Sequence, residues 1–147
     1  MKKFKFSLQN LLDLRIKQLE EKQIEFGKLQ FAMRTLQNEL SNLQEEYSCS
    51  KSTLLNRLTI NEKMDIALIS ANQRHIAQKE IDISNQEQLI ANHKIKLEEK
   101  QKEMIEAMKA KTMLEKLKEK QLKAFLKALD DTEKKELDEI GLVRYAR

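Results

Sequence analysis

The chain has 147 residues and a formal net charge of +4; 35% of its residues are charged, 5% are aromatic, and it holds two glycines and no proline. Turns use glycine and proline, so this composition argues against a compact globular domain with many turns. Glu, Lys, Leu and Gln dominate instead, and these helix formers favour a thin protein built from long helices.

The sequence offers no recognisable catalytic, cofactor or metal site. The single Cys49 excludes an internal disulfide, and His75 and His93 lie far apart without a metal-binding spacing. Two glycines cannot supply a phosphate-binding loop, and no nucleophile motif is present. We therefore predict that the protein is not an enzyme and binds no cofactor. No apolar run approaches the roughly 20 residues of a membrane span, and the N-terminus lacks a signal peptide's apolar core, so we expect a cytoplasmic protein.

The first predicted helix covers about residues 8–58 and begins after Ser7, whose hydroxyl can cap its first turn. Gly27 lies inside it, either to let a neighbour approach closely or as a tolerated defect. A heptad repeat keeps one stripe of a helix against a partner. Here the stripe has one column of Leu19, Phe26, Met33, Leu40, Tyr47 and Leu54, and a second of Leu29, Leu36 and Leu43.

The second predicted helix covers about residues 65–140, after a turn at about residues 59–64 where the heptad phase slips by one residue. Asp65 is a candidate N-cap, and Gly141 is a natural residue to end the helix. Its heptad column consists of Ile69, Ile76, Ile83, Ile90, Leu97 and Met104.

The two columns pair in reverse order. Leu19 with Met104, Leu54 with Ile69, and the four couples between them all have residue numbers that add up to 123. A chain that folds back on itself gives such a constant sum. We therefore predict an all-α fold, a long antiparallel two-helix coiled-coil hairpin that forms a single domain over residues 1–147. The same sum places Leu29 opposite Lys94, Leu36 opposite Glu87, and Leu43 opposite Glu80. These leucines would then be half covered and open to a third helix.

The second helix is longer than the first, so everything beyond about Glu115 is expected to project as a C-terminal helical overhang. Residues 109–127 carry seven lysines against two glutamates, and residues 130–139 carry six acids against two lysines. Apolar residues at helical spacing have no expected partner there, namely Leu117, Leu122, Phe125, Leu126 and Leu129. Such a stripe either frays, self-associates or docks into another protein, and we favour docking.

Both ends of the chain resemble one protein family. The aromatic pair Phe4 and Phe6 precedes a Leu-x-x-Leu-Leu-x-Leu-Arg pattern at residues 8–15. Residues 115–120 read Glu-Lys-Leu-Lys-Glu-Lys, and residues 135–140 read Lys-Glu-Leu-Asp-Glu-Ile. With the two-helix pattern between them, these segments resemble the FliJ family, small coiled-coil proteins of the bacterial flagellar export apparatus.

The resemblance implies a stalk similar in architecture to the central shaft of rotary ATPases. Such a stalk inserts the end that bears both termini into the flagellar export ATPase hexamer and promotes its assembly and activity. It also contacts the cytoplasmic domain of the export gate and binds the flagellar escort chaperones. It would be cytoplasmic, held at the inner membrane of the flagellar base only through the export gate.

The candidate partner-binding residues follow from the predicted hairpin together with the resemblance to the FliJ family. Those expected at the ATPase end are Leu8, Leu12, Leu122, Phe125, Leu129, Lys116, Lys120 and Lys123. Those expected to contact the gate or the chaperones are Leu29, Leu36 and Leu43.

Two other functions remain as alternatives. A holding chaperone or adaptor of the prefoldin type would need strand-forming segments between the helices, and residues 59–66 show no strand-like alternation. Binding of nucleic acid or acidic lipid by residues 109–127 is disfavoured, because Phe125 is the only aromatic residue interleaved with these lysines. We expect no nucleic-acid partner.

Overall fold

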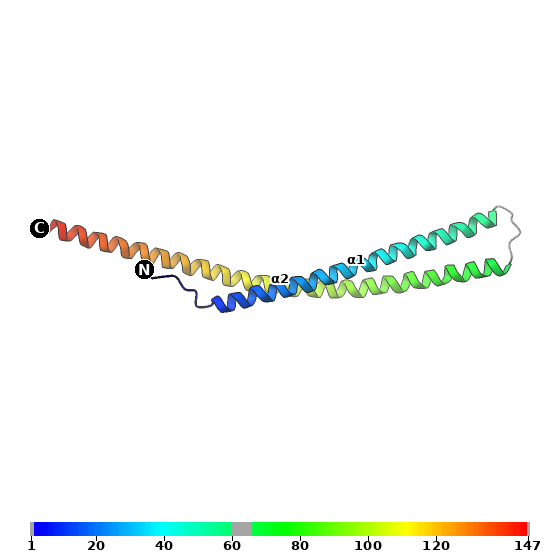
Figure 1. The fold of residues 1–147 in the computed structure, drawn as a ribbon, viewed down its shortest axis with the longest axis horizontal. Helices are drawn as coiled ribbons and strands as arrows, with labels where there is room; N and C mark the ends of the chain where they lie inside the picture. The colour runs from blue at the N-terminus through cyan, green and yellow to red at the C-terminus, as the bar shows by residue number, and fades with distance from the viewer. Residues whose placement is uncertain (1, 60–65, 147) are drawn as a thin grey trace. The chain divides into compact units, whose positions relative to one another are not determined.

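A computed structural model describes residues 2–59 and 66–146 and is helical over nearly all of them. Helix α1 covers Gln9–Thr59, 51 residues, and helix α2 covers Ile66–Tyr145, 80 residues (Figure 1). The described residues contain no strand. The predicted all-α fold with two long packed helices is confirmed. The predicted turn and the proposed cap Asp65 lie outside the described residues, as does most of the segment where a prefoldin-type protein would need strands.

Two helix ends differ from the prediction. The backbone N–H of Leu12 donates to Leu8 at 2.9 Å, so Leu8 rather than Ser7 holds the capping position, and the turn before it is closed by Gln9 N–H donating to Phe6 at 3.1 Å. Helix α2 does not stop at Gly141 but continues through Tyr145. Gly141 does not adopt the left-handed backbone conformation that ends many helices. With helix-compatible neighbours, its cost of about 1 kcal/mol is too small to end α2.

The chain divides into two compact units, each built from a piece of both helices. Unit 1 comprises Met1–Lys22 and Glu103–Arg147, and therefore holds both termini. Unit 2 comprises Gln23–Lys102.

In unit 2 the two helices pair antiparallel. Glu25 binds Lys100 at 2.9 Å, and Tyr47 Oη donates to Glu80 at 2.8 Å, so the partner's number falls as the number along α1 rises. The heptad columns Phe26, Met33, Leu40, Tyr47, Leu54 and Ile69, Ile76, Ile83, Ile90, Leu97 are half-buried. A narrow seam between two helices covers each side chain on one side only, which explains why most of these residues keep some exposure.

The alternate layers of unit 2 were assigned to the wrong residues of α2. Lys94, Glu87 and Glu80 are exposed, and the half-buried or buried positions are one residue earlier, at His93, Gln86 and Lys79. Gln86 and His93 donate N–H groups to backbone carbonyls of α1, and Lys79 forms an ion pair with Glu46, so each of these polar side chains has a partner across the seam. The spacing of apolar residues in the sequence does not show which polar side chains will find partners across the seam.

The most buried apolar residues all belong to unit 1. Phe6 is 8% exposed, and Leu12 and Leu19 are each 4% exposed. Lys22 forms an ion pair with Glu103 at 2.9 Å in the same unit. Unit 1 therefore has a better-covered interior than unit 2, where Gln86 is the one described residue that is buried.

Candidate partner-binding surfaces

Residues 2–7, which we call the N-terminal strap, lie along α2 in unit 1 (Figure 1). The Phe4 ring packs on the Phe125 ring with centroids 5.6 Å apart and planes tilted by 51°. Phe6 is buried, and just beyond the strap Lys118 Nζ donates to Gln9 Oε1 at 2.7 Å. The strap therefore covers part of α2 that a helix of the same length would not reach.

The expectation that α2 has no intrachain partner beyond Glu115 is wrong at Lys118, which contacts Gln9, and at Phe125, which contacts Phe4. An extended strand advances about 3.3 Å per residue, whereas a helix advances about 1.5 Å. Between the contact of Gln9 with Lys118 and that of Phe4 with Phe125, five residues of the N-terminal segment advance along seven residues of α2, which is further than five helical residues would advance. Sequence reasoning used Phe4 and Phe6 only as a family signature. Their alternation, with one residue between two aromatic side chains, was the available signal for an extended segment with one buried face.

The residues predicted for the ATPase end differ in how far they are exposed. Leu8 and Leu122 are each 37% exposed, whereas Phe125 and Leu129 are half-buried. Leu12 is buried, so it packs inside unit 1 and presents no surface to a partner. All eight predicted residues belong to unit 1.

The predicted lysines Lys116, Lys120 and Lys123 are exposed on α2. Lys123 pairs with Glu119 on the same helix at 3.1 Å, with both side chains more than half exposed. Exposed pairs of this kind contribute little to stability, so the ammonium group remains available to an acidic partner.

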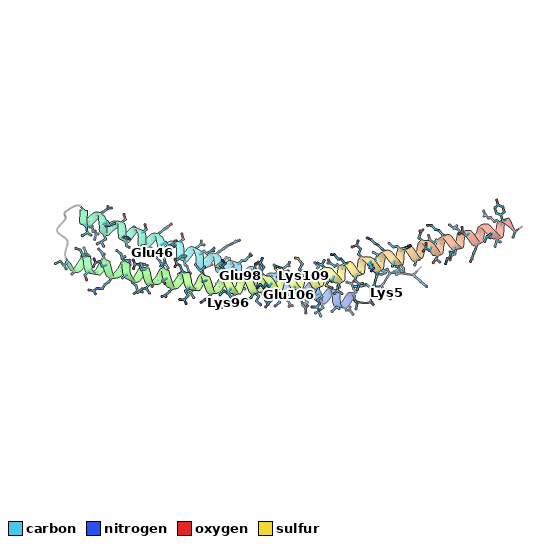
Figure 2. All side chains as sticks on the ribbon, turned by 180° about the vertical axis from the view of Figure 1, so that it is seen from behind. Lys5, Glu46, Lys96, Glu98, Glu106 and Lys109 are labelled. Carbon is cyan, nitrogen blue, oxygen red and sulfur yellow. The ribbon has the colours of Figure 1, made fainter. Side chains whose placement is uncertain are left out.

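A second group of exposed residues in unit 1 was not singled out from the sequence. Ile105 is 43% exposed, Met108 47% and Met113 72%, and they line a shallow groove with Lys109, Thr112 and Lys116. Figure 2 labels Lys109 on this part of α2. The heptad column through Met104 describes only the face of α2 that packs against α1. It therefore did not identify the apolar residues on the other faces of α2.

The last part of α2 is exposed on all sides. Every described residue from 130 to 146 is exposed, and Figure 2 shows their side chains standing out from the helix with no second helix beside them in unit 1. Leu137 is 67% exposed, Ile140 55% and Val143 61%. This is a large apolar exposure for one helical segment, and it marks a candidate interaction surface.

The leucines predicted for the gate or chaperones, Leu29, Leu36 and Leu43, are half-buried in unit 2. The ring N–H of His93 donates to the Leu29 carbonyl at 2.7 Å, and Gln86 Nε2 donates to the Leu36 carbonyl at 2.9 Å. At the layer of Leu43, Lys79 of α2 forms an ion pair with Glu46. At each of these leucines, α2 thus contributes a polar side chain to the seam instead of an apolar one, and part of the leucine surface stays uncovered.

Three further observations concern chemistry. Within residues 2–59 and 66–146, no group of three or more His, Cys, Asp or Glu side chains could hold a metal ion. Cys49 is a free, exposed thiol. None of the described helices combines the length and apolarity needed to cross a membrane.

Comparison with known families gives a match over nearly the whole chain. The family described as "Flagellar FliJ protein" matches residues 4–147. The chain belongs to the FliJ family. Neither the curated proteins nor the solved structures gave a match. Membership makes the chain a coiled-coil protein related to flagellar export, in a family whose members are structural or regulatory rather than catalytic.

Proposed function

We propose that the chain is the stalk of the flagellar export ATPase. In this proposal unit 1 enters the ATPase ring and promotes its assembly and activity. The chain also links the ATPase to the export gate and to the escort chaperones, and it is held near the inner membrane only through the gate. The stalk itself catalyses no reaction.

The observation that carries the proposal is the FliJ family match together with the character of unit 1. Unit 1 holds both termini, and its α2 portion presents exposed lysines beside partly exposed apolar side chains. An apolar anchor with a basic surround suits an acidic protein surface, where the apolar contact supplies affinity and the lysines raise the association rate. The residues proposed to contact the ATPase are Leu8, Leu122, Phe125, Leu129, Lys116, Lys120 and Lys123, and Leu12 is buried in the same unit.

The partly covered leucines of unit 2 support a proposed contact with the gate or the chaperones. Leu29, Leu36 and Leu43 form a row in which each residue has a polar group across the seam. An apolar face of a third helix can complete such layers. This contact is proposed separately from the ATPase contact, because it uses the other unit.

The ATPase contact is tested with a lysine variant. Lys116→Ala, Lys120→Ala and Lys123→Ala in one chain should weaken stimulation of the purified export ATPase and flatten its salt dependence, because the removed charges steer association. All three side chains are exposed, so the variant should fold normally. Stimulation that is unchanged in strength and in salt dependence would place the ATPase contact elsewhere.

The matched control removes three exposed lysines from α2 in unit 2. Lys94→Ala, Lys96→Ala and Lys102→Ala change the net charge by the same amount and leave unit 1 intact. This control should stimulate the ATPase as the unaltered chain does. Truncation after about residue 115 is a poorer test, because it would also remove Phe125 and Lys118 and uncover the strap.

A further inference from the structure

We propose that two copies of this chain associate antiparallel through the outward face of α2 in unit 1, with the two-fold axis near residue 124. This inference does not rest on the proposed function. The face is a stripe of α2 at alternating spacings of three and four residues, which we call the outer stripe. It consists of Ile105, Met108, Thr112, Glu115, Glu119, Leu122, Leu126, Leu129, Glu133, Glu136, Ile140 and Val143.

The outer stripe lies apart from the seam with α1. Ten of its twelve residues are exposed, and only Thr112 and Leu129 are half-buried. Six of the exposed residues are apolar, with exposed fractions of 43% for Ile105, 47% for Met108, 37% for Leu122, 55% for Leu126, 55% for Ile140 and 61% for Val143. A face with this much exposed apolar surface needs an occupant.

The arrangement of these six residues identifies a second copy as the occupant. Their positions are the same when the stripe is reversed about residue 124. Ile105 exchanges with Val143, Met108 with Ile140, and Leu122 with Leu126. In an antiparallel pair related by a two-fold axis, each residue meets its reversed counterpart on the other copy. Each of these three pairs occurs twice, so six layers of the interface are apolar on both sides.

The charges agree with the same reversal. Turning the helix about residue 124 lays the acidic segment 130–139 of one copy against residues 109–118 of the other. That stretch contains four lysines and one glutamate, against six acids and two lysines in the acidic segment. Lys109 meets Glu139 of the other copy, and Lys116 lies near Asp130 of the other copy. Opposite charges in flanking positions fix partner and orientation in paired helices.

Two features of the pairing are unfavourable, because the same reversal places Glu119 opposite Leu129 of the other copy and one glutamate opposite another. Glu115 meets Glu133 of the other copy, and both are exposed in the single chain. Like charges at facing positions weaken association by a modest amount at ordinary salt. We therefore expect a reversible dimer that forms at micromolar or higher concentration. Because the dimer covers Leu122, a copy bound to a second copy would have less of unit 1 available to other proteins.

The first test measures the mass of the full chain by sedimentation over a range of concentrations. The single chain has a mass of 17.4 kDa, and the proposal requires a shift toward twice that value. Ile140→Ser with Val143→Ser alters four of the six apolar layers and should raise the dissociation constant at least tenfold. The matched control, Leu137→Ser with Leu142→Ser, changes residues that are 67% and 70% exposed but lie off the outer stripe, and it should leave association unchanged.

A charge exchange tests the register and the orientation. Lys109→Glu with Lys116→Glu makes one variant whose copies should repel one another, and Asp130→Lys with Glu139→Lys makes a second. Mixed in equal amounts, the two variants should form a one-to-one dimer, because every altered charge then meets an opposite charge. A chain that stays monomeric at all concentrations overturns the proposal, as does a mixture that associates no better than either variant alone. None of these measurements includes the ATPase, so their failure leaves the proposed function unaffected.

Discussion

Replacing Gln86 by Leu should stabilise unit 2. Gln86 is 8% exposed, and its Nε2 donates to the Leu36 carbonyl at 2.9 Å and to Glu39 at 3.1 Å. A leucine buried there contributes roughly 1.5–3 kcal/mol, while the lost hydrogen bonds cost roughly 0.5–1.5 kcal/mol each, and the low end applies here because both acceptors keep other partners. The Leu36 carbonyl keeps its bond within α1, and Glu39 is exposed to water, so no polar atom is left unpaired. The free energy of unfolding should therefore rise by about 1 kcal/mol.

The measurement is thermal or urea unfolding followed by circular dichroism, where about 1 kcal/mol corresponds to a Tm increase of roughly 2–4 °C for a chain of this size. Glu87→Leu is the matched control, because Glu87 is the next residue and is exposed. It should change the free energy of unfolding by no more than about 0.5 kcal/mol. If Glu87→Leu stabilises the chain and Gln86→Leu does not, the seam follows the simple constant sum and our assignment of the polar layers is refuted.

Three other substitutions test separate parts of the structure. Phe4→Ala and Phe125→Ala should couple in a double-mutant cycle by about 0.5–1.5 kcal/mol, because the rings are in contact; additive effects would mean that the strap does not pack on α2. Gly141→Ala should raise helicity and stability by up to about 1 kcal/mol, because an added Cβ meets no atom within 4 Å, and a loss of far-UV dichroism would contradict a continuous α2. Leu40→Ala should cost about 2 kcal/mol and Leu36→Ala less, because only the Leu40 layer is apolar on both helices; equal unfolding free energies would remove that distinction.

Much of the fold could be predicted because a heptad repeat carries its own geometry. The column from Phe26 to Leu54 had to face a partner, and the only matching column was the one from Ile69 to Leu97 in reverse order. Helix ends were harder to predict. Gly141 carried a signal that usually ends a helix, and its cost was too small to do so in α2.

The candidate surfaces were predicted only in part. The lysines of unit 1 could be predicted as a surface because many lysines occur close together in the sequence, and lysine side chains are usually exposed. The burial of Leu12 and the partial cover of Phe125 could not be predicted, because they depend on where the strap lies. Helical periodicity describes helices, and it gives no position for a segment that is not helical.

The sequence by itself determined that the chain forms two long helices, which of their columns meet, and in which direction. These properties depend on the spacing of apolar residues, which the chain carries locally. Only the tertiary structure decided that Gln86 and His93, rather than Glu87 and Lys94, enter the seam. It also decided that Phe4 reaches Phe125. The physical reason is that both outcomes depend on which polar or aromatic group finds a partner across the interface, and that partner lies more than 45 residues away in the chain.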